Sequence, residues 1–579
     1  MLNIEHVIRD RFPQLADKPA LIRQPTVSLL KRLTHESEVN HFLSAHQDAG
    51  PFEFVDEVLE RFQISYQVSD RQRENIPTEG RVVIVANHPL GTLDGLALLK
   101  LVGEVRRDVK IVANDMLMHF EPLSPLLLAI DVVSQKRYRA ASQKVVDALT
   151  AEEAVIIFPA GEVSRAGPTG IKDGRWQSGF LHFARKTNAP ILPVHVSARN
   201  SALFYSLCLL YRPIGSLLLV NEMFKKHAVD IPIRIGELIP LERFDVQDLS
   251  TRTKIKLLRK HVYRLAKGKP PLFVTEKSIA HPEDCQAVRT ELRQGERLGS
   301  TADGKQIWLL GYAPDSAVMR EIGRLREMTF RRVGEGTGSR RDLDAYDREY
   351  RHLILWDDEA LEIVGAYRIA EAGELLKRHG RSGLYSASLF RYGDAIIPQL
   401  AEGIELGRSF VQPRYWGKRS LDYLWFGIGA YLRSRPHIKW MFGPVTLSNS
   451  LPTQAKDLLV TYYRHYYGHN DPSTGAMANA PYRISAVGQR EAESIFEFKD
   501  AREDFIALRE RLDLYGVTVP TLYKQYTEVC EEGGVRFLDF SVDADFGYCI
   551  DGLVMVDIDK LKPRKRERYM GRLDSASDA

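Results

Sequence analysis

The chain has 579 residues, of which 44% are hydrophobic and 27% are charged. This is the composition of a globular protein, and it excludes collagen-like, mucin-like and disordered classes for the bulk of the chain. Eighty Lys and Arg against 76 Asp and Glu leave a net charge of +4, which is too nearly balanced to indicate nucleic-acid binding.

The cysteines and the apolar runs restrict the compartment. The four cysteines are widely spaced, without a CxxC pair, which predicts a reducing compartment with neither a disulfide framework nor a zinc site; they are Cys208, Cys285, Cys530 and Cys549. The start of the chain lacks the continuous apolar segment of a secretory signal. The apolar runs at 122–133 and 202–220 are too short or too broken for a spanning helix. They are expected either to enter one membrane leaflet or to be core helices.

The N-terminal half alternates between strand and helix patterns. Residues 1–75 are mixed and mostly helical in pattern. Strands are then predicted over 81–86, 110–114, 154–158 and 190–196, with helices over 94–105, 140–151 and 177–187. This alternation predicts an α/β domain with a largely parallel sheet, which we place at 76–270.

The C-terminal half has a different pattern. Residues 271–304 are rich in Pro, Gly and charge, which is typical of a linker. Beyond them, strands are predicted over 307–313, 352–358, 362–370, 404–411 and 439–445, and helices over 316–328 and 419–433. This pattern predicts a mixed α+β domain over 305–579, which is no duplicate of the first because no internal repeat is visible.

The first domain carries a His and an Asp just past a strand end. The strand at 81–86 runs into NHPLGTLDG, residues 87–95, which contains His88 and Asp94. A carboxylate at a helix start can hold one imidazole nitrogen and leave the other as general base toward a hydroxyl, and Pro89 and Gly91 supply a tight turn. A His and an Asp in a loop are nevertheless more often structural than catalytic.

A second block, FPAGEVSR at 158–165, also follows a strand end, where open α/β sheets bind ligands. Ser164 and Arg165 can bind an anionic group through charge-assisted hydrogen bonds. We expect Asn87 and Glu162 to contact substrate as well.

These blocks, followed by APILPVHV at 189–196, resemble the lysophospholipid acyltransferase family, also called the 1-acylglycerol-3-phosphate O-acyltransferase family, over residues 80–240. The resemblance implies an acyl thioester donor and a hydroxyl acceptor, with His88 as general base and Asp94 stabilising the imidazolium. Two positions depart from the family pattern. Five residues instead of four separate His88 from Asp94, and Ala160 replaces the Glu of Phe-Pro-Glu-Gly. The altered block resembles the branch associated with ornithine-lipid and other aminolipid synthesis, whose acceptor is not a glycerol phosphate.

The second domain places charged residues in apolar strands, where they are costly unless paired or used. Glu405 and Arg408 are three residues apart, so they would face opposite sides of a strand unless a bulge at Gly407 intervenes. Structural ion pairs are one explanation of this pattern, and a substrate site is the other. The residues concerned are Arg326, Phe330, Asp344, Asp347, Arg368, Glu405 and Arg408.

Their order resembles the acyl-homoserine-lactone synthase and ornithine-lipid N-acyltransferase branch of the GNAT-like fold over residues 300–450. The stretch to about residue 570 resembles the continuation of hemolysin-like N-acyltransferases. The resemblance implies that these residues surround an amine and an acyl-carrier-protein thioester. Glu405 is expected as the base or amine-positioning group, and Arg408 or Arg368 as the partner of the amino acid's carboxylate.

Basic segments indicate partners. Residues 413–420, PRYWGKRS, precede an apolar helix and would suit phosphopantetheine or an acidic carrier protein. The loop lacks a full Gly-rich coenzyme A motif, so acyl carrier protein is the expected donor, acyl-CoA is the alternative, and no bound cofactor or metal is expected. The basic residues in 560–571 and 225–227 suit anionic lipid or a carrier protein, or are simply solvated. We expect peripheral attachment to the cytoplasmic face of the inner membrane.

Together the two resemblances imply a bifunctional aminolipid synthase. The C-terminal domain would N-acylate an amino acid, ornithine being the first choice, with a 3-hydroxyacyl group, and the N-terminal domain would then acylate the 3-hydroxyl of that lyso-lipid. The alternatives are a glycerophospholipid acyltransferase with a binding or regulatory GNAT-like domain, a non-enzymatic interaction module, and a synthase that uses glycine, glutamine or lysine.

Overall fold

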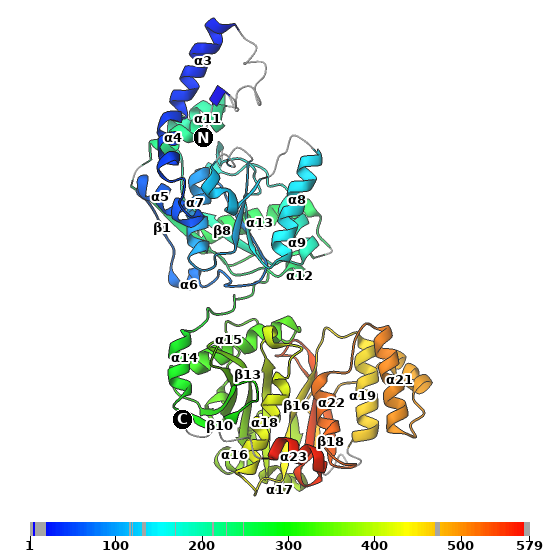
Figure 1. Cartoon of the computed structure of the whole chain (residues 1–579). Helices are drawn as coiled ribbons and strands as arrows, with labels where there is room; N and C mark the ends of the chain where they lie inside the picture. The colour runs from blue at the N-terminus through cyan, green and yellow to red at the C-terminus, as the bar shows by residue number, and fades with distance from the viewer. Residues whose placement is uncertain are drawn as a thin grey trace. The chain divides into compact units, whose positions relative to one another are not determined.

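The chain forms two compact units, Met1–His281 and Pro282–Ala579 (Figure 1). The computed structural model describes residues 4–5, 19–114, 117, 120–129, 135–167, 170–210, 214–226, 228–246, 248–468 and 475–571. Part of the segment expected as a linker belongs to the second unit, where it forms α14 (Cys285–Leu292) and β10 (Glu296–Ser300).

A seven-stranded sheet forms the centre of the first unit. Its order is β1-β9-β8-β2-β5-β3-β4, and neighbouring strands are parallel except for β8 and β9. The predicted α/β class is thereby confirmed. The strands are β1 (Ile64–Gln67), β2 (Val82–Ala86), β3 (Val109–Ala113), β4 (Leu127–Ala129), β5 (Ala154–Ile157), β8 (Ile191–Val196) and β9 (Val229–Ile235).

Helices cover both faces of this sheet, so every residue of β2 is buried and the strand is a continuous apolar run. One face packs on α5 (Pro51–Arg61) and α7 (Thr92–Gly103). The other packs on α8 (Gln135–Thr150), α9 (Gly179–Thr187) and α13 (Thr251–Leu265) (Figure 1). Other helices among the described residues of this unit are α3 (Ala20–Leu33), α4 (Glu36–Ala45), α6 (Asp70–Arg73), η2 (Glu121–Leu126), α10 (Ala202–Leu210), α11 (Ile214–Phe224) and α12 (Leu241–Phe244).

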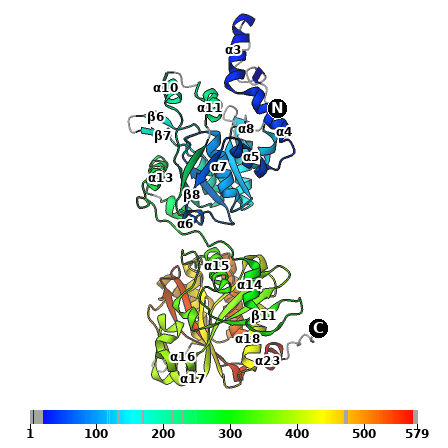
Figure 2. The same cartoon turned by 90° about the vertical axis from the view of Figure 1, so that its left-hand side faces the viewer.

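A small hairpin of β6 (Arg165–Gly167) and β7 (Gly170–Lys172) lies beside α10 (Figure 2). The predicted apolar run at 202–220 contains α10 and the first part of α11. No helix within the described parts of the chain is both long enough and apolar enough to cross a membrane.

The second unit has an eight-stranded sheet in the order β10-β11-β12-β13-β15-β16-β19-β18. Only β15 and β16 are parallel among the adjacent pairs, and their ladder is short, joining residues 403–405 to 440–442. The strands are β11 (Gln306–Gly311), β12 (Arg351–Asp357), β13 (Glu362–Glu371), β15 (Gly403–Val411), β16 (Trp440–Leu447), β18 (Val535–Asp543) and β19 (Cys549–Asp557).

Helices again flank this sheet. On one face, α18 (Ser420–Arg433) and α19 (Thr453–Tyr467) bury their apolar sides against the main core. The other face carries α15 (Ala317–Arg332), which contacts β13 and β15, and α16 (Ala372–His379). Further elements are α17 (Ile397–Ala401), α20 (Ala486–Ile495), α21 (Ala501–Leu514), α22 (Thr521–Glu528), α23 (Pro563–Met570) and a small sheet of β14 (Phe390–Tyr392) and β17 (Ala476–Ala478).

The basic tail is partly structural. Its helix α23 packs on α18, where Tyr569 Oη donates to Asp422 at 2.9 Å and Arg568 forms an ion pair with the same carboxylate at 2.6 Å. Arg568, one of the cations of residues 560–571, is therefore used in an ion pair inside the unit.

Candidate active sites

The first site is built where β2 meets α7. Asp94 is fully buried in the first turn of α7, and its Oδ2 accepts hydrogen bonds from the backbone amides of Leu90 at 2.7 Å and Gly91 at 3.1 Å. The same oxygen lies 3.2 Å from Nδ1 of His88. Gly91 has a φ of 92°, which a residue with a side chain rarely adopts, so glycine lets the turn accommodate the extra residue between His88 and Asp94.

His88 is held on several sides. Its ring stacks on Phe158 with centroids 4.0 Å apart, its backbone amide donates to Asp173 at 3.2 Å, and its side chain is 19% exposed. Burial raises the pKa of Asp94, while His88 and the amides of Leu90 and Gly91 lower it. With Nδ1 beside the carboxylate, Nε2 is the nitrogen left for proton transfer.

Asp173 is a site residue that no sequence motif indicated. This buried carboxylate accepts from the hydroxyl of Ser164 at 2.6 Å and from Nε1 of Trp176 at 2.8 Å, besides the amide of His88. It thereby ties the loop after β2 to the loop after β5. Its position in IKDGRW gives no spacing signal, because the link depends on the folded arrangement of the loops.

The other predicted contacts of the first site have different surroundings. Asn87 is buried and uses its amide group on the backbone of Val196, in bonds of 2.7 and 2.9 Å, so it joins β2 to β8. Ser164 is buried against Asp173. Glu162 and Arg165 form an ion pair of 2.5 Å at the surface. Of these four residues, only Glu162 and Arg165 are accessible enough to meet a substrate directly.

An apolar cavity of about 170 Å³ adjoins the His88 loop. Leu90, Leu93 and Leu96 form the part of its wall that belongs to the loop and to α7. Its other apolar lining residues come largely from α4, α5 and α11, and include Phe42, Leu43, Phe54, Val58, Met223 and Phe224. The loop that carries the His–Asp pair therefore borders a space lined by hydrocarbon side chains.

The second site depends on a bulge in β15. Gly407 pairs with Arg368 and Phe410 pairs with Ala366, so two residues of β15, Arg408 and Ser409, stand opposite one residue of β13. Arg408 has a φ of 48°, an unfavourable left-handed conformation for a residue with a side chain. The bulge lies next to Gly407, as the spacing of Glu405 and Arg408 requires if they share a face, and it brings both side chains to the same side of the sheet.

Arg326, Asp347 and Arg368 form a buried ion-pair network. Arg326 bonds to Asp347 at 2.8 Å, and Arg368 bonds to Asp344 at 2.6 Å and to Asp347 at 3.3 Å. Burial alone would raise the pKa of Asp347, but the two guanidinium groups hold it well below its usual range. Burial and Arg326 also lower the pKa of the adjacent His352, to about 3, so His352 is neutral.

The depressed pKa of Asp347 gives the second unit a defined acid sensitivity. The ordinary pKa of an Asp is about 3.9. The ionised Asp347 carboxylate therefore contributes its full stabilisation above roughly pH 4 to 5, and this stabilisation is lost as the pH falls toward the pKa of Asp347 in the folded protein. Asp347→Asn should lower the free energy of unfolding by about 3 to 5 kcal/mol at pH 7. Urea unfolding at pH 7 and pH 3 should show a smaller difference in the free energy of unfolding between wild type and Asp347→Asn at pH 3 than at pH 7. An equal difference at both pH values would contradict a depressed pKa of Asp347.

Arg408 joins this network to a second group of side chains. Its Nε lies 3.1 Å from Asp342 and its Nη1 donates to Tyr385 at 2.8 Å. The guanidinium also stands 4.9 Å from the ring of Phe546, which makes an edge contact with Phe330 at 5.1 Å. Phe330 thus contributes an apolar wall near Arg408, and Asp342 and Tyr385 are contacts that the motif spacing did not reveal.

Glu405 is buried, and both of its oxygens are occupied. Oε1 accepts from the amide of Ser386 at 2.7 Å, and Oε2 accepts from the amide of Tyr385 at 3.1 Å and from the hydroxyl of Tyr350. Burial raises the pKa of Glu405, and the hydrogen bonds from Ser386 and Tyr350 oppose that rise. The carboxylate therefore fixes the 385–386 segment, whose Tyr385 ring also lies 4.8 Å from the guanidinium carbon of Arg368.

The loop expected to meet the acyl donor lies between β15 and α18. Tyr415 is buried and donates hydrogen bonds to Asp357 and Glu362, whereas the neighbouring Trp416 is 46% exposed. Gly417 takes a φ of 74° just before α18 begins at Ser420. The basic residues Arg414, Lys418 and Arg419 are exposed, which leaves them accessible to a donor.

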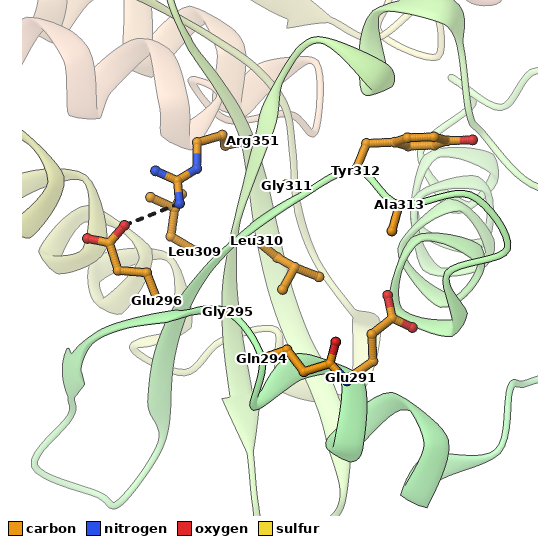
Figure 3. A pocket seen from close by; sticks show the side chains of 10 residues that line it. All are labelled: Glu291, Gln294, Gly295, Glu296, Leu309, Leu310, Gly311, Tyr312, Ala313 and Arg351. Atoms are coloured by element: carbon orange, nitrogen blue, oxygen red, sulfur yellow. Dashed lines mark hydrogen bonds and ion pairs between the residues drawn. The ribbon is translucent and has the colours of Figure 1, made fainter.

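A larger cavity, of about 570 Å³, lies at the β10 edge of this sheet, around β10 and β11 (Figure 3). Arg351 and Glu296 form an ion pair of 3.2 Å on one side, and the Tyr312 side chain lies at the other end. None of the site residues predicted from the sequence lines this cavity. Its lining residues are Glu291, Gln294, Gly295, Glu296, Leu309, Leu310, Gly311, Tyr312, Ala313 and Arg351.

Two family models match the two halves of the chain separately. A family model described as Acyltransferase matches residues 7–269, and one described as Acetyltransferase (GNAT) domain matches residues 325–426. The glycine N(alpha)-acyltransferase of Bacteroides thetaiotaomicron is 30% identical over 305 residues, 50% of this chain and 89% of that protein. The lyso-glycine lipid O-acyltransferase of the same organism is 30% identical over 252 residues, 42% of this chain and 90% of that protein. The L-ornithine N(alpha)-acyltransferase of Rhizobium meliloti is 33% identical over 136 residues, 22% of this chain and 45% of that protein.

The chain is therefore an enzyme of the acyltransferase class. It belongs to the acyltransferase family of the two Bacteroides thetaiotaomicron relatives. Its N-terminal half is an acyltransferase domain and its C-terminal half contains a GNAT-like domain. The predicted fold classes of both halves are confirmed.

Proposed function

We propose that the chain makes a diacylated aminolipid in two steps. The second unit joins a 3-hydroxyacyl group to the α-amino group of an amino acid, and the first unit then acylates the 3-hydroxyl of that lyso-lipid. The observation that carries this proposal is the pairing of two acyl-transfer sites in one chain, each with its own relative. Among the relatives the two activities belong to separate proteins, named glycine N(alpha)-acyltransferase and lyso-glycine lipid O-acyltransferase.

The O-acyl step uses the His88–Asp94 pair. Neutral His88 takes the proton of the lyso-lipid hydroxyl through Nε2 as the oxygen attacks the thioester carbonyl. Asp94, 3.2 Å from Nδ1, stabilises the imidazolium, and the proton then passes to the leaving thiolate. Asp94 is itself held by two backbone amides, so the pair is preorganised before substrate binds.

The apolar cavity beside the His88 loop supports this role, because a lipid substrate needs a site for an acyl chain close to the reacting hydroxyl or thioester. Met223 is a partly buried part of its wall, so a larger side chain there can reduce the space without replacing a core residue. Met223→Trp should shift O-acylation toward shorter acyl chains by several-fold. Val246→Trp, at an exposed position of the same unit, is the matched control. An unchanged preference for acyl-chain length in Met223→Trp would show that the cavity does not bind the acyl chain.

The N-acyl step places the amino acid between the sheet and the 385–386 segment. Arg408 and Arg368 are the candidate partners of its carboxylate, because planar guanidinium groups bind carboxylates bidentately. Arg368 is fully buried, and its Nε and Nη2 have no hydrogen-bond partner among the described residues, so donors remain for a ligand. The α-amino nitrogen then attacks the thioester carbonyl and the thiolate leaves.

Ornithine is the amino acid that we propose, on the resemblance of the charged motifs and the altered Phe-Pro block. Glycine is the second candidate, because the relatives that match along about nine-tenths of their own length are named for glycine. A direct competition between the two amino acids for one acyl thioester separates these candidates.

For the acyl donor we propose acyl carrier protein, with acyl-CoA as the alternative. The exposed cations of the 413–420 loop and the start of α18 support binding of a phosphopantetheine phosphate or an acidic carrier surface. We further propose peripheral binding to the cytoplasmic face of the inner membrane, with the cations near residue 225 and in 560–571 meeting anionic lipid. His227 lies outside the described residues.

An assay with purified protein distinguishes the proposed function from its main rival. The protein is given an acyl thioester with either lyso-ornithine lipid or lysophosphatidic acid, and product is measured by mass spectrometry. We expect lyso-ornithine lipid to be acylated at a rate at least ten-fold higher than lysophosphatidic acid. Acylation of lysophosphatidic acid alone would make the chain a glycerophospholipid acyltransferase, and no acylation of either lipid would overturn the proposed O-acyl step.

A further inference from the structure

The second unit contains a buried carboxylate, Asp551, at the point where two central strands separate. The ladder between β15 and β16 ends at Glu405 and Phe442. Thr446 lies four residues further along β16 and pairs directly with Asp551 of β19. Asp551 therefore lies beside the part of β16 that is no longer hydrogen-bonded to β15. Arg408 lies in the corresponding part of β15, which follows Glu405.

Strand alternation places Asp551 on the same face as Glu405. Phe442 is the register partner of Glu405, and Thr446 is an even number of residues from Phe442, so all three side chains share one face. Asp551 joins them because register partners in an antiparallel pair point to the same side. This is the face on which Arg368 and Arg408 form their ion pairs, as their contacts with the 342–347 loop show.

Asp551 has one strong hydrogen bond and one weak contact. Its Oδ1 accepts from the hydroxyl of Thr446 at 2.7 Å, and its Oδ2 faces the thiol of Cys549 at 4.0 Å, the outer limit for sulfur. Its side chain is buried, at 3% exposure. Glu405 differs because strong donors occupy both of its oxygens, so Asp551 is the better placed of the two to exchange a proton.

The electrostatic surroundings of Asp551 are mixed. Burial and the nearby Asp543 raise the pKa of Asp551, the hydroxyl of Thr446 and the guanidinium of Arg408 lower it, and together they place it at about 7. Burial and, to a smaller extent, the neighbouring Asp551 together raise the pKa of Glu335 to about 8. The titratable groups that Asp551 influences from neighbouring segments also include Tyr385, Tyr523 and Cys549.

We propose that Asp551 is the proton acceptor for the α-amino group in the N-acyl transfer, and that Glu405 is a positioning residue. This inference rests on the proposed function of the second unit. The ammonium group gives one proton to the Asp551 carboxylate. The neutral nitrogen attacks the thioester carbonyl carbon, the N–C bond forms and the C–S bond breaks, and the second nitrogen proton goes to the leaving thiolate. Asp551 then releases its proton to solvent.

The test is the pH profile of N-acylation by the full-length protein, measured with ornithine or glycine and a 3-hydroxyacyl thioester between pH 5.5 and 9. The wild-type kcat/KM should rise with pH through an inflection near 7. Asp551→Asn should lower kcat at least about 100-fold and remove that inflection. Asp545→Asn is the matched control, because it makes the same chemical change at an exposed position of the neighbouring turn.

A second variant keeps the carboxylate and changes only its environment. Thr446→Val removes the hydrogen bond that lowers the Asp551 pKa, so the inflection should move to higher pH while the maximal rate at high pH is retained. This variant remains informative if Asp551→Asn folds poorly.

The outcomes separate this inference from the proposed function. A wild-type inflection that persists in Asp551→Asn and does not move in Thr446→Val would overturn the inference alone. An altered preference between ornithine and glycine with an unchanged pH profile would also overturn it, since Asp551 would then bind a side-chain ammonium group. If the wild-type protein N-acylates no amino acid, the proposed function fails, and the inference fails with it.

Discussion

Replacing His88 with alanine should reduce O-acylation by at least about 100-fold while N-acylation continues, so that the monoacylated aminolipid accumulates. The reason is that Asp94 holds Nδ1 of His88 at 3.2 Å, and no other imidazole belongs to this buried loop. The measurement is the ratio of monoacyl to diacyl product by mass spectrometry, with both acylation steps supplied with thioester.

A matched control for His88→Ala is His182→Ala, which removes an exposed imidazole from α9 of the same unit. The control should make diacyl product at the wild-type ratio. Diacyl product at wild-type levels in His88→Ala would contradict the assignment of His88 as the general base. Loss of both products would show that the two steps are not independent.

Replacing Glu405 with alanine should stop the pathway one step earlier and leave no acylated amino acid. The carboxylate accepts hydrogen bonds from the amides of Tyr385 and Ser386, and its removal leaves these buried donors unsatisfied at a cost of about 1 to 3 kcal/mol each. The segment that brings Tyr385 to Arg408 and Arg368 would lose its anchor. The measurement is N-acylation with added amino acid, followed by O-acylation with added lyso-lipid in the same protein.

The O-acyl step serves as the internal control for Glu405→Ala, because that step depends on the first unit. It should proceed at the wild-type rate when lyso-lipid is supplied. Glu405→Gln keeps the shape and one of the two acceptor oxygens, so it should retain more N-acylation than Glu405→Ala if Glu405 positions the segment. Equal and complete loss in both variants, with an intact fold, would instead make Glu405 the proton acceptor.

The sequence predicted those features that depend on local patterns. Apolar runs ending at polar blocks identified β2 and β5, and the NHPLGTLDG motif brought His88 and Asp94 together because Pro89 and Gly91 allow a tight turn. The bulge that places Glu405 and Arg408 on one face could be anticipated, because their spacing of three would otherwise separate two charged side chains in a buried strand. Each of these inferences uses residues within about ten positions of one another.

The features that were missed depend on contacts across long distances in the sequence. Asp173 is 85 residues from the amide of His88 that it accepts from, and Asp551 is 105 residues from its partner Thr446. The folded arrangement of the loops decides the first contact and strand order decides the second, and neither was readable from the hydrophobic pattern. Ser164 and Asn87 were expected to meet substrate, yet both are buried in structural hydrogen bonds, because polar residues in loops next to strands also serve to close the ends of a sheet.

The central claim is that one chain carries out both acylations, and lipid mass spectrometry of a host that lacks aminolipids tests it most directly. Expression of the wild-type chain should produce a diacylated aminolipid, His88→Ala should leave only its monoacyl precursor, and Glu405→Ala should leave neither. Absence of any new aminolipid with the wild-type chain, when the protein is present and folded, would contradict the account.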